Sequence, residues 1–146
     1  DIILLFGSGF ALAKGFDVSG LSEWMAGHLN FLKGAPIAVI ILAVCVVVCI
    51  ISEFASNVAS IQLVLPVLLA VSKSIDVNPL LLMLPATLAA SLGYMLPVAT
   101  AANTIVFGTK MVPLKSMLRS GFWVDLAGIV LICLGGLFLV QILLGA

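Results

Sequence analysis

Two short polar segments interrupt long apolar runs of this sequence, and both carry groups that can bind ions. The first is residues 52–57, SEFASN, and the second is residues 100–103, TAAN. Both supply hydroxyl, amide and carbonyl oxygens, the ligands that hard cations take. Polar residues within lipid-compatible sequence are costly and mark functional sites. Neither segment contains Arg or Lys, so an anion bound there must be held by helix N-termini and amides.

Each segment also has a structural interpretation, because small residues with Ser, Thr and Asn allow membrane helices to pack closely. The presence of two such segments favours ion binding. Glu53 is the acid of the first segment, and we expect backbone amides to satisfy it in a structural role; the alternative is a carrier of a proton or ion. Asp125 lies early in the last apolar run, where we expect it to snorkel to the interface or to pair.

The composition indicates that lipid surrounds most of the chain. Of 146 residues, 64% are hydrophobic and 8% are charged, whereas soluble domains have about 25% charged residues. Six basic residues balance six acidic ones, which leaves no positive field for nucleic acid. We expect no enzyme, because the sequence has no phosphate loop, nucleophile elbow or metal-ligand spacing; an intramembrane enzyme with Glu53 as base lacks a nucleophile or metal set beside it. Cys45, Cys49 and Cys133 lie in apolar runs and are expected to pack as small hydrophobes.

Residues 1–33 predict the end of a scaffold helix followed by an interfacial arm. Residues 1–13 are too short to cross about 30 Å of hydrocarbon, and we interpret them as part of a longer polypeptide. Residues 14–33 mix polar and apolar side chains at helical spacing around Trp24, which is typical of an amphipathic helix lying at the membrane surface. His28 belongs to this arm, where we expect it at the surface.

Residues 35–72 predict two apolar helices joined at the first polar segment. An open strand in lipid leaves its backbone unpaired, so both arms must be helical. The second arm, residues 58–71, is only about 21 Å long as a helix, and Ser56 or Asn57 is suited to cap it. Two interpretations are open: two short spans joined by a turn in water, or a re-entrant hairpin that dips to mid-membrane. We favour the hairpin, because the turn carries one Glu and mostly small residues.

Residues 79–112 predict a broken transmembrane helix. Pro97 removes a backbone donor and disfavours helix at the preceding residue. Thr100 and Asn103 are both suited to cap a helix that restarts near Asn103.

A last transmembrane helix is expected over residues 120–145. Before it, Lys110, Lys115 and Arg119 fall within ten residues that contain no acid. The positive-inside rule assigns this loop to the cytoplasm. The mouth of the hairpin and the C-terminus then face outward.

These motifs together resemble the divalent-anion:sodium symporter (DASS) family, transporters of dicarboxylates, citrate and sometimes sulfate. Residues 52–58 resemble its second Ser-Asn-Thr-type signature, and residues 95–108 resemble its second broken-helix signature. Residues 5–13 resemble the glycine-rich end of the helix that precedes its second interfacial arm. The resemblance runs over essentially the whole chain, which corresponds to the C-terminal half of the family's protein.

The resemblance implies an all-α polytopic membrane protein, half of an inverted-repeat transporter with a re-entrant hairpin, one broken helix and one final helix. Residues 34–146 would be half of a transport domain that moves elevator-fashion against a scaffold, with a separate N-terminal half and a homodimer in the inner or plasma membrane. The implied function is sodium-coupled symport of di- or tricarboxylates such as succinate, fumarate, malate and citrate. The alternative is a channel or structural membrane subunit that uses the breaks for packing or pore lining.

The resemblance also implies a site at the two polar segments. Sodium would bind the side chains of Ser52 and Asn57 and the carbonyls of Ala55 and Ala99. Substrate carboxylates would meet Ser56, Asn57 and Thr100. Sodium would order the hairpin tip and the break, so that the anion site forms only with the cation bound.

Two departures from the family pattern affect the choice of substrate. Val58 follows Asn57 where family members often carry a hydroxyl residue, which removes one donor. Residues 101 and 102 are both Ala where the family often has two prolines, which makes the break more flexible. The substrate among succinate-like dicarboxylates, citrate and sulfate is therefore left open.

Overall fold

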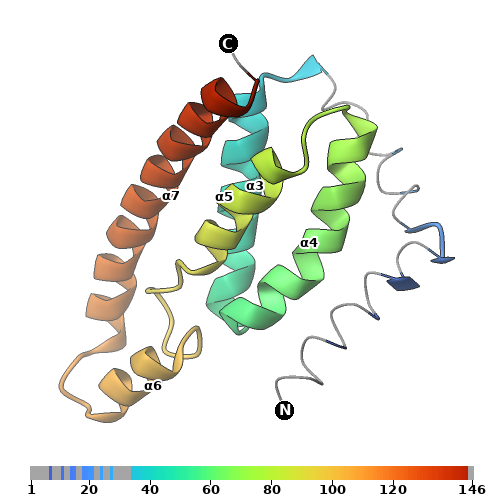
Figure 1. The fold of residues 1–146 in the computed structure, drawn as a ribbon. Coiled ribbons are helices and arrows are strands. Elements are labelled where there is room, and N and C mark those ends of the chain that lie inside the picture. The colour runs from blue at the N-terminus through green and yellow to red at the C-terminus, as the bar shows by residue number, and fades with distance from the viewer. Residues whose placement is uncertain are drawn as a thin grey trace.

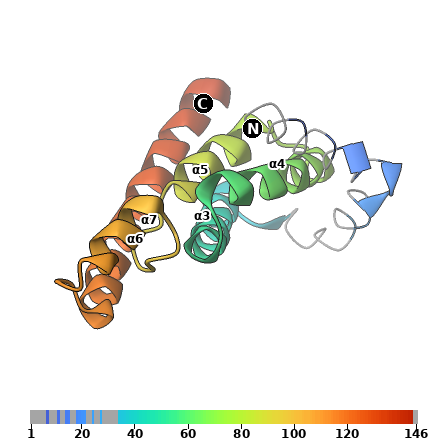
Figure 2. The ribbon, with the colours of Figure 1, turned by 90° about the horizontal axis from the view of Figure 1, so that it is seen from below.

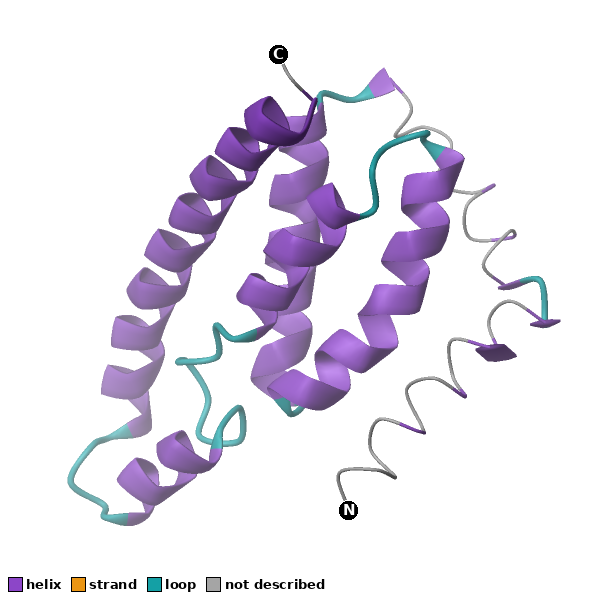
Figure 3. Ribbon diagram, in the orientation of Figure 1, coloured by secondary structure: helices purple, strands orange, loops and turns teal. Residues whose placement is uncertain are grey.

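The computed structural model describes residues 34–144 continuously, with side chains to residue 138, and before them only positions 7, 11, 14, 15, 18–21, 24 and 27. The expected scaffold-helix end and interfacial arm, including His28, therefore lie largely outside the described residues. Residues 34–144 contain helices and connecting loops and no strand (Figure 3). The helices are α3 (Ile37–Phe54), α4 (Asn57–Ser74), α5 (Leu80–Ala90), α6 (Ala101–Gly108) and α7 (Leu114–Leu144).

Three of the described helices are long and apolar enough to cross a membrane: α3, α4 and residues 114–138 of α7. The other two are shorter, with 11 residues in α5 and 8 in α6. This pattern confirms the prediction of an all-α polytopic membrane protein.

The helices pack around α5 (Figure 1). Helices α3 and α4 are joined by only two residues and run antiparallel, and α5 contacts both of them. Helix α7 packs against α3 and α5 on the side away from α4, and α6 lies beyond the end of α5, beside the start of α7 (Figures 1 and 2). Two of the junctions between helices, the α3–α4 turn and the α5–α6 connection, therefore lie near each other.

Glycines set the register of α7 against its neighbours. A Cβ atom on Gly136 would lie 3.3 Å from Pro85 Cγ and 3.5 Å from Ile41 Cγ2, near the start of α3. A Cβ on Gly121 would overlap the Tyr94 carbonyl, which follows the end of α5. Helix α7 thus runs antiparallel to α3 and α5, at distances that only small residues permit.

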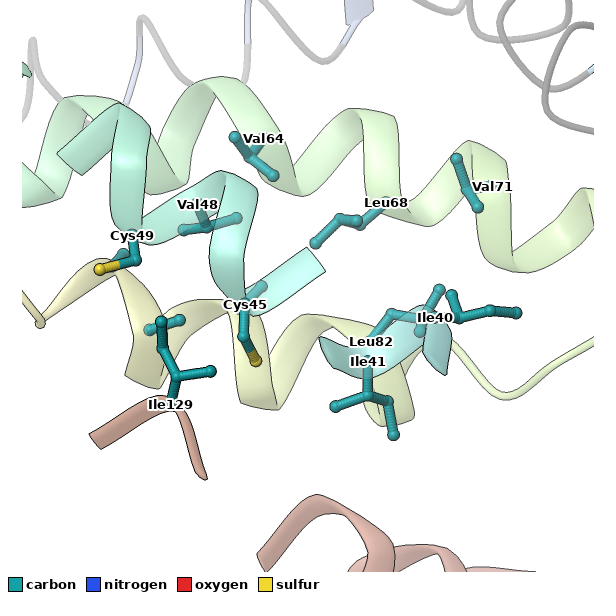
Figure 4. Close-up of a cluster of buried hydrophobic side chains, with 13 residues drawn as sticks. Ile40, Ile41, Cys45, Val48, Cys49, Val64, Leu68, Val71, Leu82 and Ile129 are labelled. Atoms are coloured by element: carbon teal, nitrogen blue, oxygen red, sulfur yellow. The ribbon is translucent and has the colours of Figure 1, made fainter. Parts of the chain in front are cut away.

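The core lies between α3, α4, α5 and the middle of α7 (Figure 4). Ile41, Cys45, Leu82 and Ala86 have 0% exposure, and Val48 has 1%. Cys45 and Cys49 both belong to this cluster, which confirms that these cysteines act as packing residues.

Helix α7 begins earlier than the sequence suggested. We expected it from residue 120, but it starts at Leu114, because Pro113 is preorganised for the first turn and its carbonyl accepts hydrogen bonds from the Ser116 and Met117 amides. Lys115 and Arg119 therefore lie on the first turns of a helix, and only Lys110 lies in the loop.

Candidate ion and substrate site

The hairpin tip is a two-residue break between α3 and α4. Ala55 and Ser56 are extended, and Ser56 is the N-cap of α4, where its Oγ accepts a hydrogen bond of 3.4 Å from the Ala59 amide. Of the two caps that the sequence allowed, the structure uses Ser56. Asn57 is therefore the first residue of α4. Its side chain points toward α3, where its Oδ1 accepts a hydrogen bond from the Ser52 hydroxyl.

The second break extends over residues 91–100, between α5 and α6. It begins directly after α5, which ends at Ala90, and so starts earlier than the interruption expected at Pro97. Thr100 caps α6 and accepts a hydrogen bond of 3.1 Å from the Asn103 amide. The helix restarts at Ala101, so Asn103 is not a cap and lies in the first turn instead. Its Nδ2 donates to the carbonyls of Gly93 at 2.7 Å and Leu96 at 3.0 Å.

Glu53 ties the hairpin to this second break. It is 4% exposed, and its two carboxylate oxygens accept hydrogen bonds from the amides of Met95 at 2.9 Å and Leu96 at 2.8 Å. These backbone donors have no helical partner because the chain is unwound there. The prediction that nearby backbone amides satisfy Glu53 is confirmed.

The Ser52 hydroxyl lies beside two other oxygen atoms at the base of the hairpin tip. Its hydroxyl is fully buried and lies 2.6 Å from the carbonyl of Ala90 and 2.7 Å from Asn57 Oδ1. A hydroxyl has one proton to donate, and the Ala90 carbonyl and Asn57 Oδ1 are both acceptors. The Ser52 hydroxyl can therefore donate a hydrogen bond to only one of them at a time. The end of α5, the end of α3 and the start of α4 meet here as a cluster of oxygens.

Gly93 lies at the centre of this cluster, and the sequence reasoning did not single it out. A Cβ atom there would be 3.3 Å from Ala99 Cβ, 3.5 Å from Asn57 Oδ1 and 3.8 Å from the carbonyl oxygen of Ser52. Ser52, Asn57 and Ala99, three residues expected at a sodium site, are therefore brought together around a position that has no side chain. An isolated glycine in an apolar run shortly before a proline is a signal of close backbone approach.

The remaining expected site residues adjoin this cluster along the chain. Ala55 and Thr100 are half-buried, Ser56 is exposed, and Ala99 is 3% exposed. Ser56 and Thr100 each accept a hydrogen bond from an amide in the first turn of their own helix, α4 and α6. The N-termini of both helices, which carry partial positive charge, thus begin at the two breaks.

Of the two roles expected for Asp125, snorkelling to the interface and pairing, the structure contradicts the first. Asp125 lies eleven residues into α7, about 16 Å along the helix from Leu114, which is too far for a short side chain to reach the end. The residue is 4% exposed and its carboxyl interacts with that of Glu53. The early start of α7, which the sequence did not indicate, explains the difference.

The family model described as "Sodium:sulfate symporter transmembrane region" matches residues 1–145. A sodium-dependent dicarboxylate transporter, SdcS, of Staphylococcus saprophyticus is 45% identical over 144 residues, which are 99% of this chain and 28% of that protein. The human Na(+)/dicarboxylate cotransporter 3 is 44% identical over 134 residues, 92% of this chain and 22% of that protein. The chain therefore spans about a quarter of the length of these relatives, which are named as transporters and not as enzymes. From the match over nearly its whole length, the chain belongs to the sodium:sulfate symporter family, the group of divalent-anion:sodium symporters whose motifs its two polar segments resemble.

Proposed function

We propose that this chain is the C-terminal part of a sodium-coupled symporter of di- or tricarboxylates, such as succinate, fumarate, malate and citrate. The observation that carries the proposal is the cluster of Ser52, Asn57 and Ala99 around Gly93, where the hairpin tip meets the helix break. The names of the relatives support sodium and dicarboxylate as the transported pair.

The cluster suits sodium because its polar atoms are all oxygens of uncharged groups. The Ser52 hydroxyl and Asn57 Oδ1 lie 2.7 Å apart, and the carbonyls of Ala55 and Ala99 belong to unwound backbone at the two breaks. Carbonyls of unwound segments and helix C-terminal ends coordinate sodium in transporters with broken helices. Sodium at this place is a transported substrate that these four residues would bind.

The anion would bind at the N-termini of α4 and α6. Ser56 and Thr100 are the caps of these helices, and Asn57 is the first residue of α4. Residues 91–108 contain no charged side chain, and Glu53 is the only one in residues 52–57. The substrate carboxylates would therefore be held by hydroxyls, the Asn57 amide and partial helix charge.

Asn57 links the two sites, because it belongs to both sets of residues. Sodium that binds its side chain together with Ser52 and Ala99 would fix the hairpin tip against the break. The anion site would then be complete only when sodium is bound, which couples the two by shared preorganisation.

The packing along α7 supports a re-entrant hairpin in preference to two full spans. The start of α3 lies near Gly136 and its end, at Glu53, lies at Asp125. Helix α7 then continues for eleven residues, about 16 Å, past the hairpin tip. If α7 spans the membrane, the tip lies at an intermediate depth. An elevator movement of this unit against a scaffold, a homodimer, an N-terminal half with a second hairpin, and a place in the inner or plasma membrane complete the proposal.

The test is uptake of labelled succinate by the intact protein in liposomes, with and without a sodium gradient. We expect uptake to require sodium, to saturate with succinate, and to be abolished by Asn57→Ala and Thr100→Ala. Thr100→Ser keeps the capping hydroxyl and should retain uptake, as should Thr109→Ala at the other end of α6. Uptake that is indifferent to sodium or to both alanine substitutions would refute the proposal, and unitary currents without saturation would identify a channel instead.

A further inference from the structure

The corner where α6 ends and α7 begins carries three of the six basic residues of the chain. Lys110 lies in the connection between the two helices, and Lys115 and Arg119 lie in the first two turns of α7. All three residues are exposed. Figure 1 shows this corner at the end of the structure away from the mouth of the α3–α4 hairpin. The cluster is therefore separate from the residues that we assign to sodium and the transported anion.

The positive charge of this corner is not balanced by acids. Residues 77–124 contain no Asp or Glu, and Asp125, the next acid along the chain, is only 4% exposed. Helix α7 has no acid in its first turn, although Lys115 lies there. The start of a helix carries partial positive charge and disfavours a cation. An anion bound at this corner would compensate both the three side chains and the helix end.

The geometry of α7 directs its two basic side chains toward Lys110. In an α-helix the Cα–Cβ bonds tilt toward the N-terminus, and residues four apart lie on the same face. Lys115 and Arg119 are four apart, so both side chains extend back toward the connection that holds Lys110. Long basic side chains of this kind lie along apolar surface and keep their charge at the level of the lipid headgroups.

An apolar groove of about 450 Å³ adjoins the basic cluster. Its lining comes from the end of α6, the connection and the start of α7: Phe107, Gly108, Lys110, Val112, Pro113 and Leu114. Lys110 is the one charged residue of this lining. Helix α6 itself has no buried residue among those described. The groove and the cluster together suit a molecule that joins an anionic group to a hydrocarbon chain.

The position of this corner relative to the membrane indicates which molecule that is. Leu114 begins the apolar span of α7, so the groove lies where this helix enters the bilayer. The excess of basic residues predicts the cytoplasmic side. The cytoplasmic leaflet is rich in anionic lipids, and basic pockets between membrane helices on this side bind their headgroups.

We propose that the corner between α6 and α7 binds an anionic phospholipid of the cytoplasmic leaflet. Its phosphate would meet Lys110, Lys115 and Arg119, and one acyl chain would lie in the groove. The inference rests on the proposed function only for the orientation of the chain in the membrane, and it does not depend on which anion is transported.

The test is lipid binding to the purified intact protein in an uncharged detergent. Displacement of a fluorescent phosphatidylglycerol is measured with dioleoyl phosphatidylglycerol and, in parallel, with dioleoyl phosphatidylcholine. The two lipids have the same acyl chains and differ in net charge, so phosphatidylglycerol should bind more tightly. This comparison needs no variant.

The triple variant Lys110→Gln, Lys115→Gln and Arg119→Gln should lose this preference. Each basic residue near a charged headgroup contributes about fivefold to the affinity, so the three together contribute about a hundredfold. The melting temperature without added lipid shows that the variant is folded.

The matched control replaces the other three basic residues of the chain, Lys14→Gln, Lys33→Gln and Lys73→Gln. It makes the same change in net charge elsewhere in the sequence and should keep the affinity of the wild type for phosphatidylglycerol.

A second variant tests the groove without changing any charge. A Cβ atom on Gly108 meets nothing within 4 Å among the described residues, and Gly108 lines the groove. Gly108→Phe should therefore fill the groove and weaken the binding of phosphatidylglycerol, whereas Gly108→Ala should not.

Three results would overturn the inference. The first is equal affinity for the two lipids, which is also expected if another part of the intact protein covers the groove. The second is an equal loss of affinity in both triple variants. The third is displacement of the fluorescent lipid by inorganic phosphate as readily as by phosphatidylglycerol, which would identify a site for a small anion. Sodium-dependent uptake in phosphatidylcholine liposomes tests the proposed function separately.

Discussion

Gly93 has no side chain, and this allows Ser52, Asn57 and Ala99 to lie close together. Its Cα lies where the hairpin tip, the end of α5 and the residue before Thr100 converge, and its carbonyl accepts the Asn103 amide. The position is buried, and the nearest neighbours are the side chains of Ala99 and Asn57. A methyl group there must displace at least one of the residues expected to bind sodium.

We predict that Gly93→Ala weakens sodium binding more than it weakens the fold. The added Cβ would lie 3.3 Å from Ala99 Cβ, so Ala99 must move by a few tenths of an ångström, and it would be in van der Waals contact with Asn57 Oδ1 at 3.5 Å. Overpacking of this kind costs about 1–3 kcal/mol. The sodium concentration for half-maximal succinate uptake should rise about tenfold. It can be measured in liposomes at fixed succinate.

Gly108→Ala is the matched control, because a Cβ atom at Gly108 meets nothing within 4 Å among the described residues. It should leave the sodium dependence unchanged. Equal sodium dependence in Gly93→Ala and the wild type would contradict the placement of Gly93 at the sodium site.

The site residues differ in how far the sequence could predict them. Ser56 and Thr100 were found as caps because capping is local and has a known residue preference. Glu53 was expected to find backbone donors, which it does in Met95 and Leu96. Gly93 was missed, and the sequence, which allowed Asp125 to pair, did not identify Glu53 as its neighbour. Both depend on contacts between α7, α3 and the break that no local pattern encodes.

At the scale of elements, the close approach of α7 to the second break holds the unwound backbone in place. Gly121 is buried and lies directly against the carbonyl of Tyr94, the residue that precedes Met95 and Leu96, whose amides Glu53 binds. This contact is between backbone and backbone, so neither side can yield by rotating a side chain.

We predict that Gly121→Ala destabilises the folded protein. Its Cβ would overlap the backbone of Tyr94 and Met95, which forces α7 away from the break. The melting temperature in detergent should fall, with a cost of about 1–3 kcal/mol or more. Gly135→Ala on the same helix meets nothing within 4 Å among the described residues, and since Ala is the better helix former it should not lower the melting temperature. A similar fall in melting temperature in both variants would show that replacing a glycine of α7, and not the contact of Gly121 with Tyr94, destabilises the protein.

The boundaries of the elements were harder to predict than their type. Helix was the only option for apolar runs in lipid, and all five elements in residues 34–144 are helices. The end of α5 at Ala90 was not predicted, because Ser91 and Leu92 do not break helices; the Ser52 hydroxyl that binds the Ala90 carbonyl comes from another helix. The start of α7 was misplaced because its first turns are polar and had been assigned to a loop.

At the scale of the whole molecule, the order of the elements predicts which regions lie on opposite sides of the membrane. Helices α3 and α4 form a hairpin whose mouth includes Asn78, and α6 leads to the basic segment that begins at Lys110. From the excess of basic residues we expect the second region on the cytoplasmic side and the hairpin mouth on the outer side.

We predict that Asn78→Cys reacts with a membrane-impermeant maleimide added to intact cells, and that Lys110→Cys reacts only after the membrane is opened. The natural cysteines are a low background in this assay, because Cys45 and Cys49 are buried and Cys133 is half-buried; the parent protein is the control. The reverse pattern would contradict the assigned orientation, and labelling of both positions from one side would contradict the order of spans.

The unwound segment between α5 and α6 has a further consequence for a chain that lives in lipid. Five of its polar backbone atoms form hydrogen bonds with side chains: Glu53 accepts from the amides of Met95 and Leu96, Asn103 donates to the carbonyls of Gly93 and Leu96, and the Thr104 hydroxyl donates to the Pro97 carbonyl at 2.6 Å. An unserved peptide group in hydrocarbon costs several kcal/mol. Since these partners belong to the same packed unit, we expect these hydrogen bonds to persist if the unit changes its depth in the bilayer, because none of them would have to be exchanged for a bond to water.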